Sequence, residues 1–228
     1  MKKHIPNALT CANLAAGCVG IVLAFRGELQ ASAYCVLISG IFDFFDGFAA
    51  RLLRVKSAIG KELDSLADMV SFGFLPGVVM FKLLGTSDFT SPLLPYFGFL
   101  ITIFSALRLA KFNIDERQTE DFIGLNTPMN TLFIVSLPFI AADYPHLIGS
   151  TLLLLSIAVV CSLLLVSELR IFSLKMGSVS WKDNKFKYIF LLLSAVLLAV
   201  LQFAAVPFVL VLYLAFSLLH FRKKKRLA

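Results

Sequence analysis

Residues 43–68 read DFFDGFAARLLRVKSAIGKELDSLAD, and four aspartates in this stretch decide how the rest of the chain is interpreted. Asp43 and Asp46 are three residues apart, and Asp64 and Asp68 are four apart, so each pair lies on one face of a helix. The flanking sequence on both sides is apolar. An aspartate near the middle of a membrane helix costs about 2.5–3.5 kcal/mol, so four of them require compensation.

The nature of that compensation follows from the residue types. Two such helices side by side would direct four carboxylates into one small volume, where like charges repel unless cations lie between them. Because this stretch contains no His or Cys, its all-oxygen ligand set favours Mg²⁺, Mn²⁺ or Ca²⁺ over zinc. Gly47 and Ala50 leave room for a ligand, and Arg51 is placed for a phosphate or an aspartate. The alternative for the aspartates alone is the water-filled pathway of a transporter.

The stretch resembles the signature of the CDP-alcohol phosphatidyltransferase family, D-x-x-D-G-x-x-A-R-x8-G-x-x-x-D-x-x-x-D, at every fixed position. The words LDSLAD at 63–68 and SFG at 71–73 are similar to the phosphatidylserine synthase branch. The resemblance implies an all-α, polytopic transmembrane helical bundle. It implies an enzyme that transfers the phosphatidyl group from CDP-diacylglycerol to the hydroxyl of L-serine, giving phosphatidylserine and CMP. It also implies two divalent cations, Mg²⁺ or Mn²⁺ with Ca²⁺ as a further candidate, and a homodimer.

Roles for individual residues follow from the same resemblance. The metal ligands are Asp43, Asp46, Asp64 and Asp68, and Asp68 is also the catalytic base that takes the proton of the acceptor hydroxyl. Family members carry a Pro-Asn-x-x-Thr word near the first span, and residues 6–10 here read PNALT. The residues implied to bind the CDP-lipid are Asn7, Thr10, Gly47, Ala50, Arg51 and Gly60. For Asn7 and Thr10 individually, a helix cap at the membrane entry is the alternative.

The acceptor is specified less closely. Residues 106–113, ALRLAKFN, resemble the A-R-L-A-R-F-N word of phosphatidylserine synthases, which implies that Arg108, Lys111 and Asn113 bind the acceptor. A carboxylate such as that of serine is a natural partner for Arg108 inside an apolar helix end. Anchoring of the chain at the membrane surface explains Lys111 equally well. The same chemistry with glycerol phosphate or inositol phosphate as acceptor is the alternative.

The composition predicts one membrane-embedded domain. The chain has 228 residues, of which 59% are hydrophobic and 15% charged, with a mean hydropathy of +0.88. Such values are typical of polytopic membrane proteins. We expect a single domain over residues 1–228, with a core at about 5–175 and a C-terminal helix pair and basic tail at 186–228. The expected apolar segments are 9–26, 31–53, 60–84, 92–113, 127–142, 146–166, 186–204 and 206–221.

The distribution of basic residues predicts the orientation. With eight spans, all of the 21 Lys and Arg residues except Arg26 and Lys82 fall in the two tails or in alternate loops. By the positive-inside rule, both termini and the acidic stretch face the cytoplasm of a cell membrane. The net charge of +7 therefore indicates topology and contact with membrane lipid rather than binding of nucleic acid.

Overall fold

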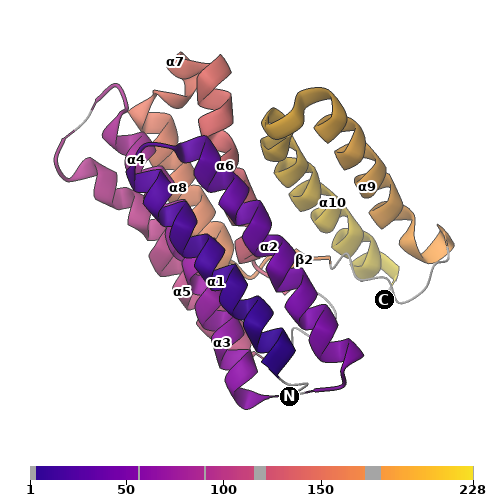
Figure 1. Ribbon diagram of the computed structural model, residues 1–228. Coiled ribbons are helices and arrows are strands. Elements are labelled where there is room, and N and C mark those ends of the chain that lie inside the picture. Colours follow the sequence, from indigo (N-terminus) through magenta and orange to yellow (C-terminus); the bar gives the residue numbers. More distant parts are fainter. Residues whose placement is uncertain (1–3, 56, 90, 116–121, 173–180, 228) are drawn as a thin grey trace.

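The computed structural model describes residues 4–55, 57–89, 91–115, 122–172 and 181–227, and these residues are almost entirely helical (Figure 1). The helical elements in chain order are α1 (His4–Phe25), α2 (Leu29–Leu52), α3 (Ala58–Asp68), η1 (Met69–Phe74), α4 (Leu75–Gly85), η2 (Leu94–Gly98), α5 (Phe99–Ile114), α6 (Thr127–Asp143), α7 (Pro145–Ile148), α8 (Thr151–Val166), α9 (Trp181–Leu201), η3 (Gln202–Ala205) and α10 (Val206–Leu227). The predicted all-α fold is confirmed. Each of the eight apolar segments expected from the sequence is helical over most of its length.

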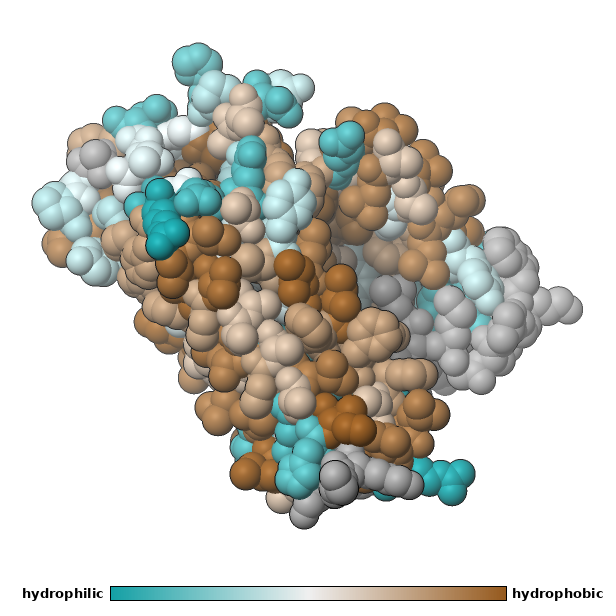
Figure 2. Space-filling view, in the orientation of Figure 1, coloured by the Kyte–Doolittle hydropathy of each residue, from teal (hydrophilic) through white to brown (hydrophobic). Residues whose placement is uncertain are grey.

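The helices are long and apolar enough for a membrane protein. Within the described residues, five helical runs are of sufficient length and hydropathy to cross a membrane, the last being the whole of Asn184–Phe221. Thr151–Val166 is apolar but shorter. Figure 2 shows hydrophobic side chains over the middle of the visible face and hydrophilic ones mainly at its two ends. Because the interior of a bilayer is apolar hydrocarbon, such a belt is the surface that faces lipid in a membrane protein.

The most enclosed element is α4. Val78, Val79 and Met80 have no exposed surface and form the centre of the main core with side chains from α1, α2, α5, α6 and α8. η1 is a π-helix that joins α3 to α4 directly, and single π turns are frequent at functional sites. Asp64 and Asp68 on α3 therefore belong to one continuous helical run, α3–η1–α4, and the α4 part of that run is packed in the core.

Local signals explain where the helices near the site begin. Ser57 caps α3, since its side chain accepts a hydrogen bond from the backbone nitrogen of Gly60. Asn126 caps α6 in the same way, accepting from the backbone nitrogen of Met129 at 3.0 Å. These caps define the first residues of α3, which bears Asp64, and of α6, which packs against η1.

A short strand pair was not predicted from the sequence. β1 (Phe122–Ile123) pairs antiparallel with β2 (Arg170–Ile171), which fastens the chain before α6 to the chain after α8. Gly124 follows β1 with φ +78, and a Cβ there would meet the carbonyl oxygens of Leu165 and Ser167. Only glycine accepts this conformation without strain.

The last two helices form a hairpin through η3, and this hairpin lies beside the main bundle (Figure 1). Phe190, Val209 and Tyr213 belong to a second apolar cluster that includes Leu125 and Ile171. The hydroxyl of Tyr213 donates to the carbonyl oxygen of Phe172 at 2.9 Å. The hairpin thus has its own contacts with the strand pair as well as with α6.

Candidate active site

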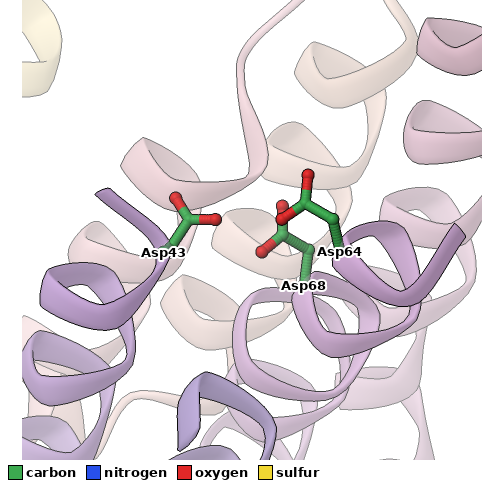
Figure 3. Close-up of side chains that lie close together, drawn as sticks. All are labelled: Asp43, Asp64 and Asp68. Carbon is green, nitrogen blue, oxygen red and sulfur yellow. The ribbon is translucent and has the colours of Figure 1, made fainter. Parts of the chain in front are cut away.

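The carboxylates of Asp43, Asp64 and Asp68 lie together between α2 and α3 (Figure 3). One oxygen from each of the three side chains lies within 4.8 Å of the others. Asp64 and Asp68 share a face of α3 as their spacing predicted, and Asp43 points at them from α2. The prediction that the two acidic helices face each other is confirmed for these three residues.

This group fits a divalent cation on the chemistry of its donors. One oxygen of Asp64 is buried and has no hydrogen-bond donor among the described residues. A buried carboxylate oxygen without a donor costs free energy unless a positive charge is supplied. The other ligands are also carboxylate oxygens, which suit Mg²⁺, Mn²⁺ or Ca²⁺. The structure therefore supports the expectation of a divalent metal.

Asp46 occupies a different environment from the other three aspartates. It is only 6% exposed, and one of its oxygens accepts a hydrogen bond from the hydroxyl of Thr10 at 2.7 Å. The Thr10 hydroxyl also lies 3.1 Å from the carbonyl oxygen of Pro6. Asp46 is not part of the three-residue group, so its expected role as a metal ligand stays a prediction.

A cleft of about 500 Å³ adjoins the acidic group. Its lining comes from α1, α2, α3 and the connection between α2 and α3: Pro6, Asn7, Thr10, Asp46, Gly47, Ala50, Val55, Ser57, Ala58, Gly60, Lys61 and Asp64. We call it the nucleotide cleft. Five of the six residues expected to bind the CDP-lipid line it, and these are Asn7, Thr10, Gly47, Ala50 and Gly60. The structure brings them together around one space.

Small residues keep the nucleotide cleft open. A Cβ on Gly60 would lie 3.1 Å from the Oδ1 atom of Asn7, so α1 and the first turn of α3 approach closely there. Arg51, the sixth expected residue, is exposed and does not line the cleft. Its guanidinium lies beside Gly47, since a Cβ at position 47 would be 3.5 Å from Nη1. Arg51 is therefore at the edge of the cleft.

Arg108 lies deep in the protein, on α5. It is only 3% exposed, its Nε donates to the carbonyl oxygen of Leu125 at 3.3 Å, and its guanidinium lies 5.3 Å from the centre of the Phe112 ring. A buried guanidinium requires anionic or carbonyl partners. Whether the expected acceptor carboxylate is one of them stays a prediction.

Lys111 and Asn113, the other two residues expected to bind the acceptor, contact side chains that are distant in the sequence. Lys111 forms an ion pair with Glu168. The side-chain amide of Asn113 donates to the hydroxyl of Ser65 at 2.8 Å, and the main-chain carbonyl oxygen of Asn113 accepts from Nζ of Lys61 at 3.2 Å. Asn113 therefore ties the end of α5 to α3, between the turns that carry Asp64 and Asp68. In this arrangement, Asn113 has a structural contact that the sequence did not indicate.

Asn13 is a site residue that the sequence reasoning missed. It is fully buried on α1, and its Nδ2 donates to an oxygen of Asp68 at 3.3 Å. Its Oδ1 is also buried, with no partner among the described residues. The available signal was the regular spacing of Asn7, Thr10 and Asn13, three residues apart and so close to one face of a helix.

Comparisons with known proteins identify the family of this chain. A family model described as CDP-alcohol phosphatidyltransferase matches residues 3–164. A Helicobacter pylori protein named CDP-diacylglycerol–serine O-phosphatidyltransferase is 30% identical over 225 residues, covering 94% of this chain and 90% of its own. A Bacillus subtilis protein of the same name is 36% identical over 142 residues, covering 60% of this chain and 76% of its own. A Methanothermobacter thermautotrophicus protein named archaetidylserine synthase is 31% identical over 134 residues, covering 58% of this chain and 56% of its own.

Proposed function

The chain belongs to the CDP-alcohol phosphatidyltransferase family, and on that premise we propose that it is a phosphatidylserine synthase. It transfers the phosphatidyl group from CDP-diacylglycerol to the hydroxyl of L-serine and releases CMP. The observation that carries the proposal is the convergence of Asp43, Asp64 and Asp68 at the edge of the nucleotide cleft. The relatives that cover most of the chain bear this activity in their names.

The nucleotide cleft orients the CDP part of the donor. The cytidine and the diphosphate enter the nucleotide cleft, where Asn7 and Thr10 supply polar side chains and Gly47 and Gly60 allow close approach of the backbone. Arg51 at the edge of the cleft is placed for a phosphate oxygen. Holding the donor in this way contributes to catalysis because phosphoryl transfer depends chiefly on position and charge.

The acidic group acts on the reacting atoms. Divalent cations held by Asp43, Asp46, Asp64 and Asp68 would neutralise the diphosphate charge and stabilise the leaving CMP. Asp68 accepts the proton of the serine hydroxyl, because an alcohol is a poor nucleophile until a base removes that proton. Arg108, which is buried on α5, binds the serine carboxylate through its guanidinium. The hydroxyl then attacks the phosphorus atom, and the bond to CMP breaks.

The setting of the reaction belongs to the same proposal. Residues 1–228 form one integral domain of the cytoplasmic membrane, with both termini and the acidic group on the cytoplasmic side. The positive-inside distribution supports this orientation. CDP-diacylglycerol in the inner leaflet and serine from the cytoplasm then reach the site from the same side. The family resemblance further supports a homodimer.

The purified protein tests the proposal directly. With CDP-diacylglycerol and Mn²⁺ or Mg²⁺, serine should release CMP and produce phosphatidylserine, whereas glycerol phosphate and inositol phosphate should not. Release of CMP with one of those two acceptors instead would retain the chemistry and overturn the acceptor. Asp68→Asn should bind CDP-diacylglycerol normally but fail to turn over. Full activity in Asp68→Asn would remove its assignment as the base.

A further inference from the structure

The helical run α3–η1–α4 contains a wider turn at η1, which begins directly after Asp68. The backbone nitrogen of Leu75 donates to the carbonyl oxygen of Val70, five residues earlier, whereas an α-helix pairs residues four apart. A turn closed in this way contains one more residue than an α turn. At 3.6 residues per turn, one residue corresponds to a rotation of about 100°. Relative to α4, the side chains of α3 are therefore rotated by about that angle compared with an uninterrupted α-helix.

This rotation matters because α4 has a fixed orientation in the core. Eight of its eleven residues are buried, and side chains from α1, α5, α6 and α8 pack around it. The core therefore sets the orientation of α4, and η1 sets where the side chains of α3 point relative to it. In the observed arrangement, Asp64 and Asp68 lie toward Asp43 (Figure 3), with oxygens of all three within 4.8 Å of one another. A rotation of about 100° would turn the two aspartates of α3 away from α2.

The sequence explains why the wider turn lies at this point. Pro76, in the first turn of α4, has no N–H group. In an α-helix, the N–H of residue 76 would donate to the carbonyl oxygen of Phe72, and a proline ring at that position clashes with the same carbonyl. A wider turn before Pro76 relieves the clash, because it changes the position of the carbonyl relative to the ring. It leaves the Phe72 carbonyl without the donor that an α-helix would supply.

A hydroxyl from α6 occupies the place of the missing amide. Thr131 is fully buried, and its Oγ1 atom lies 2.6 Å from the carbonyl oxygen of Phe72. The same atom lies 2.8 Å from the carbonyl oxygen of Thr127, the usual partner of a threonine inside a helix. A hydroxyl has one proton to donate, and the Phe72 carbonyl is both the nearer acceptor and the one that Pro76 deprives of an amide. The Thr131 hydroxyl therefore joins α6 to η1.

Two further hydroxyls hold η1 from other sides. Ser71 of η1 donates to the main-chain carbonyl oxygen of Asn13 on α1 at 3.1 Å. Thr102 of α5 donates to the carbonyl oxygen of Gly73 at 3.2 Å. η1 is thus bound by side-chain hydrogen bonds to α1, α5 and α6. Of these three contacts, the one from Thr131 reaches the carbonyl that lies four residues before the proline.

We propose that Thr131 positions the acidic group by stabilising the π-helical turn η1, which directs the two aspartates of α3 toward Asp43. Thr131 does not line the nucleotide cleft, and α6 carries none of the four aspartates of the acidic stretch, so its effect passes through η1. The inference rests on the proposed function only for the divalent metal that the acidic group holds. The turn, its cause at Pro76 and its contact with Thr131 do not depend on the acceptor.

Binding of Mn²⁺ to the metal-free, full-length protein tests this positioning role without turnover. Thr131→Val keeps the shape of the side chain and removes its hydroxyl, whereas Thr131→Ser keeps the hydroxyl. Ser136→Ala is the matched control, because the buried Ser136 hydroxyl donates within α6 to the carbonyl oxygen of Phe133 at 2.7 Å. Thr131→Val should weaken Mn²⁺ binding about tenfold, the factor that corresponds to one buried hydrogen bond, while the other two variants stay within about twofold of wild type. Equal Mn²⁺ affinities in Thr131→Val and wild type would overturn the proposal.

Hydrogen–deuterium exchange at the backbone amides of residues 69–75 tests the turn itself. In the metal-free protein, these amides should exchange about tenfold faster in Thr131→Val than in wild type, and at the wild-type rate in Ser136→Ala. Pro76→Ala restores the missing amide, so adding Thr131→Val to it should change the exchange by less than about twofold. An equally large effect of Thr131→Val in both backgrounds would show that its hydroxyl does not replace the amide, and the proposal would be wrong.

The double variant also covers a loss of folding. If Thr131→Val alone does not fold, Pro76→Ala combined with Thr131→Val should fold, because the backbone then supplies the donor. A double variant that fails as well would overturn the proposal. Failure of the wild-type protein to bind Mn²⁺, with the exchange results as expected, would instead overturn the metal of the proposed function and leave the role of Thr131 in the turn in place.

Discussion

Replacing Asn13 by alanine tests whether α1 positions the carboxylate of Asp68, which we propose as the catalytic base. The substitution removes the hydrogen bond from Nδ2 to Asp68. It leaves the main-chain carbonyl oxygen of Asn13, which accepts from the hydroxyls of Ser39 and Ser71 at 3.1 Å each. The two contributions of this residue are therefore separable: the side chain acts on Asp68, and the backbone joins α1 to α2 and η1.

The size of the effect follows from the bond. A hydrogen bond to a charged group contributes about 1.5–3 kcal/mol, and about 1.4 kcal/mol corresponds to a factor of ten. Because the distance of 3.3 Å is at the long end for such a bond, we take the lower figure and expect kcat to fall about tenfold. KM for CDP-diacylglycerol should change little, since Asn13 does not line the nucleotide cleft.

The assay is steady-state release of CMP at several Mn²⁺ concentrations, together with Mn²⁺ binding to the metal-free protein. Ser39→Ala is the control, because it weakens the contact between α1 and α2 without touching Asp68. We expect Asn13→Ala to lower kcat and to alter Mn²⁺ affinity, while Ser39→Ala changes neither by more than about twofold. A wild-type kcat in Asn13→Ala, or an equal loss in both variants, would refute the positioning role.

Three further outcomes are expected. Removal of divalent cations with EDTA should abolish CMP release, and Mn²⁺ or Mg²⁺ should restore it; activity that persists after chelation would exclude a metal in the reaction. Gly17→Val should lower the melting temperature in detergent, since a Cβ there meets the Ser71 side chain, whereas Ala15→Val on the exposed face of α1 should not. If Lys111 binds serine, Lys111→Gln should raise KM for serine and Glu168→Gln should not, because only the first substitution removes the cation. Equal effects of these two substitutions would identify the ion pair as purely structural.

The acidic helices were predictable from the sequence because their spacing obeys helix geometry. Asp43, Asp64 and Asp68 converge as expected, and the glycines at 47 and 60 line the cleft beside them. In a membrane, a charged residue must face the interior of the bundle or another charge, so its direction is strongly constrained. Few arrangements of two acidic helices satisfy that constraint, which is why pattern alone was sufficient.

The contacts of the acceptor region were not predictable in the same way. Lys111 and Asn113 lie at the end of α5, where a long side chain can reach several partners. The structure pairs Lys111 with Glu168, which is 57 residues away, and Asn113 with Ser65, which is 48 residues away. A short motif such as ALRLAKFN indicates a family resemblance, but it does not show which distant segment of the chain packs against it. The strand pair that follows Glu168 was not predictable from hydrophobic periodicity either, because each strand has only two residues.

The first helix orders the acidic residues without neutralising them. Asn7 lies close to Gly60 at the start of α3, Thr10 donates to Asp46 on α2, and Asn13 donates to Asp68. Each contact comes from a neutral side chain, so the negative charge of the carboxylates is retained. A Lys or Arg at these positions would satisfy the same oxygens with its own charge and compete with divalent cations for them. The absence of basic residues between His4 and Arg26 on α1 is therefore a requirement of the metal site as much as of membrane insertion.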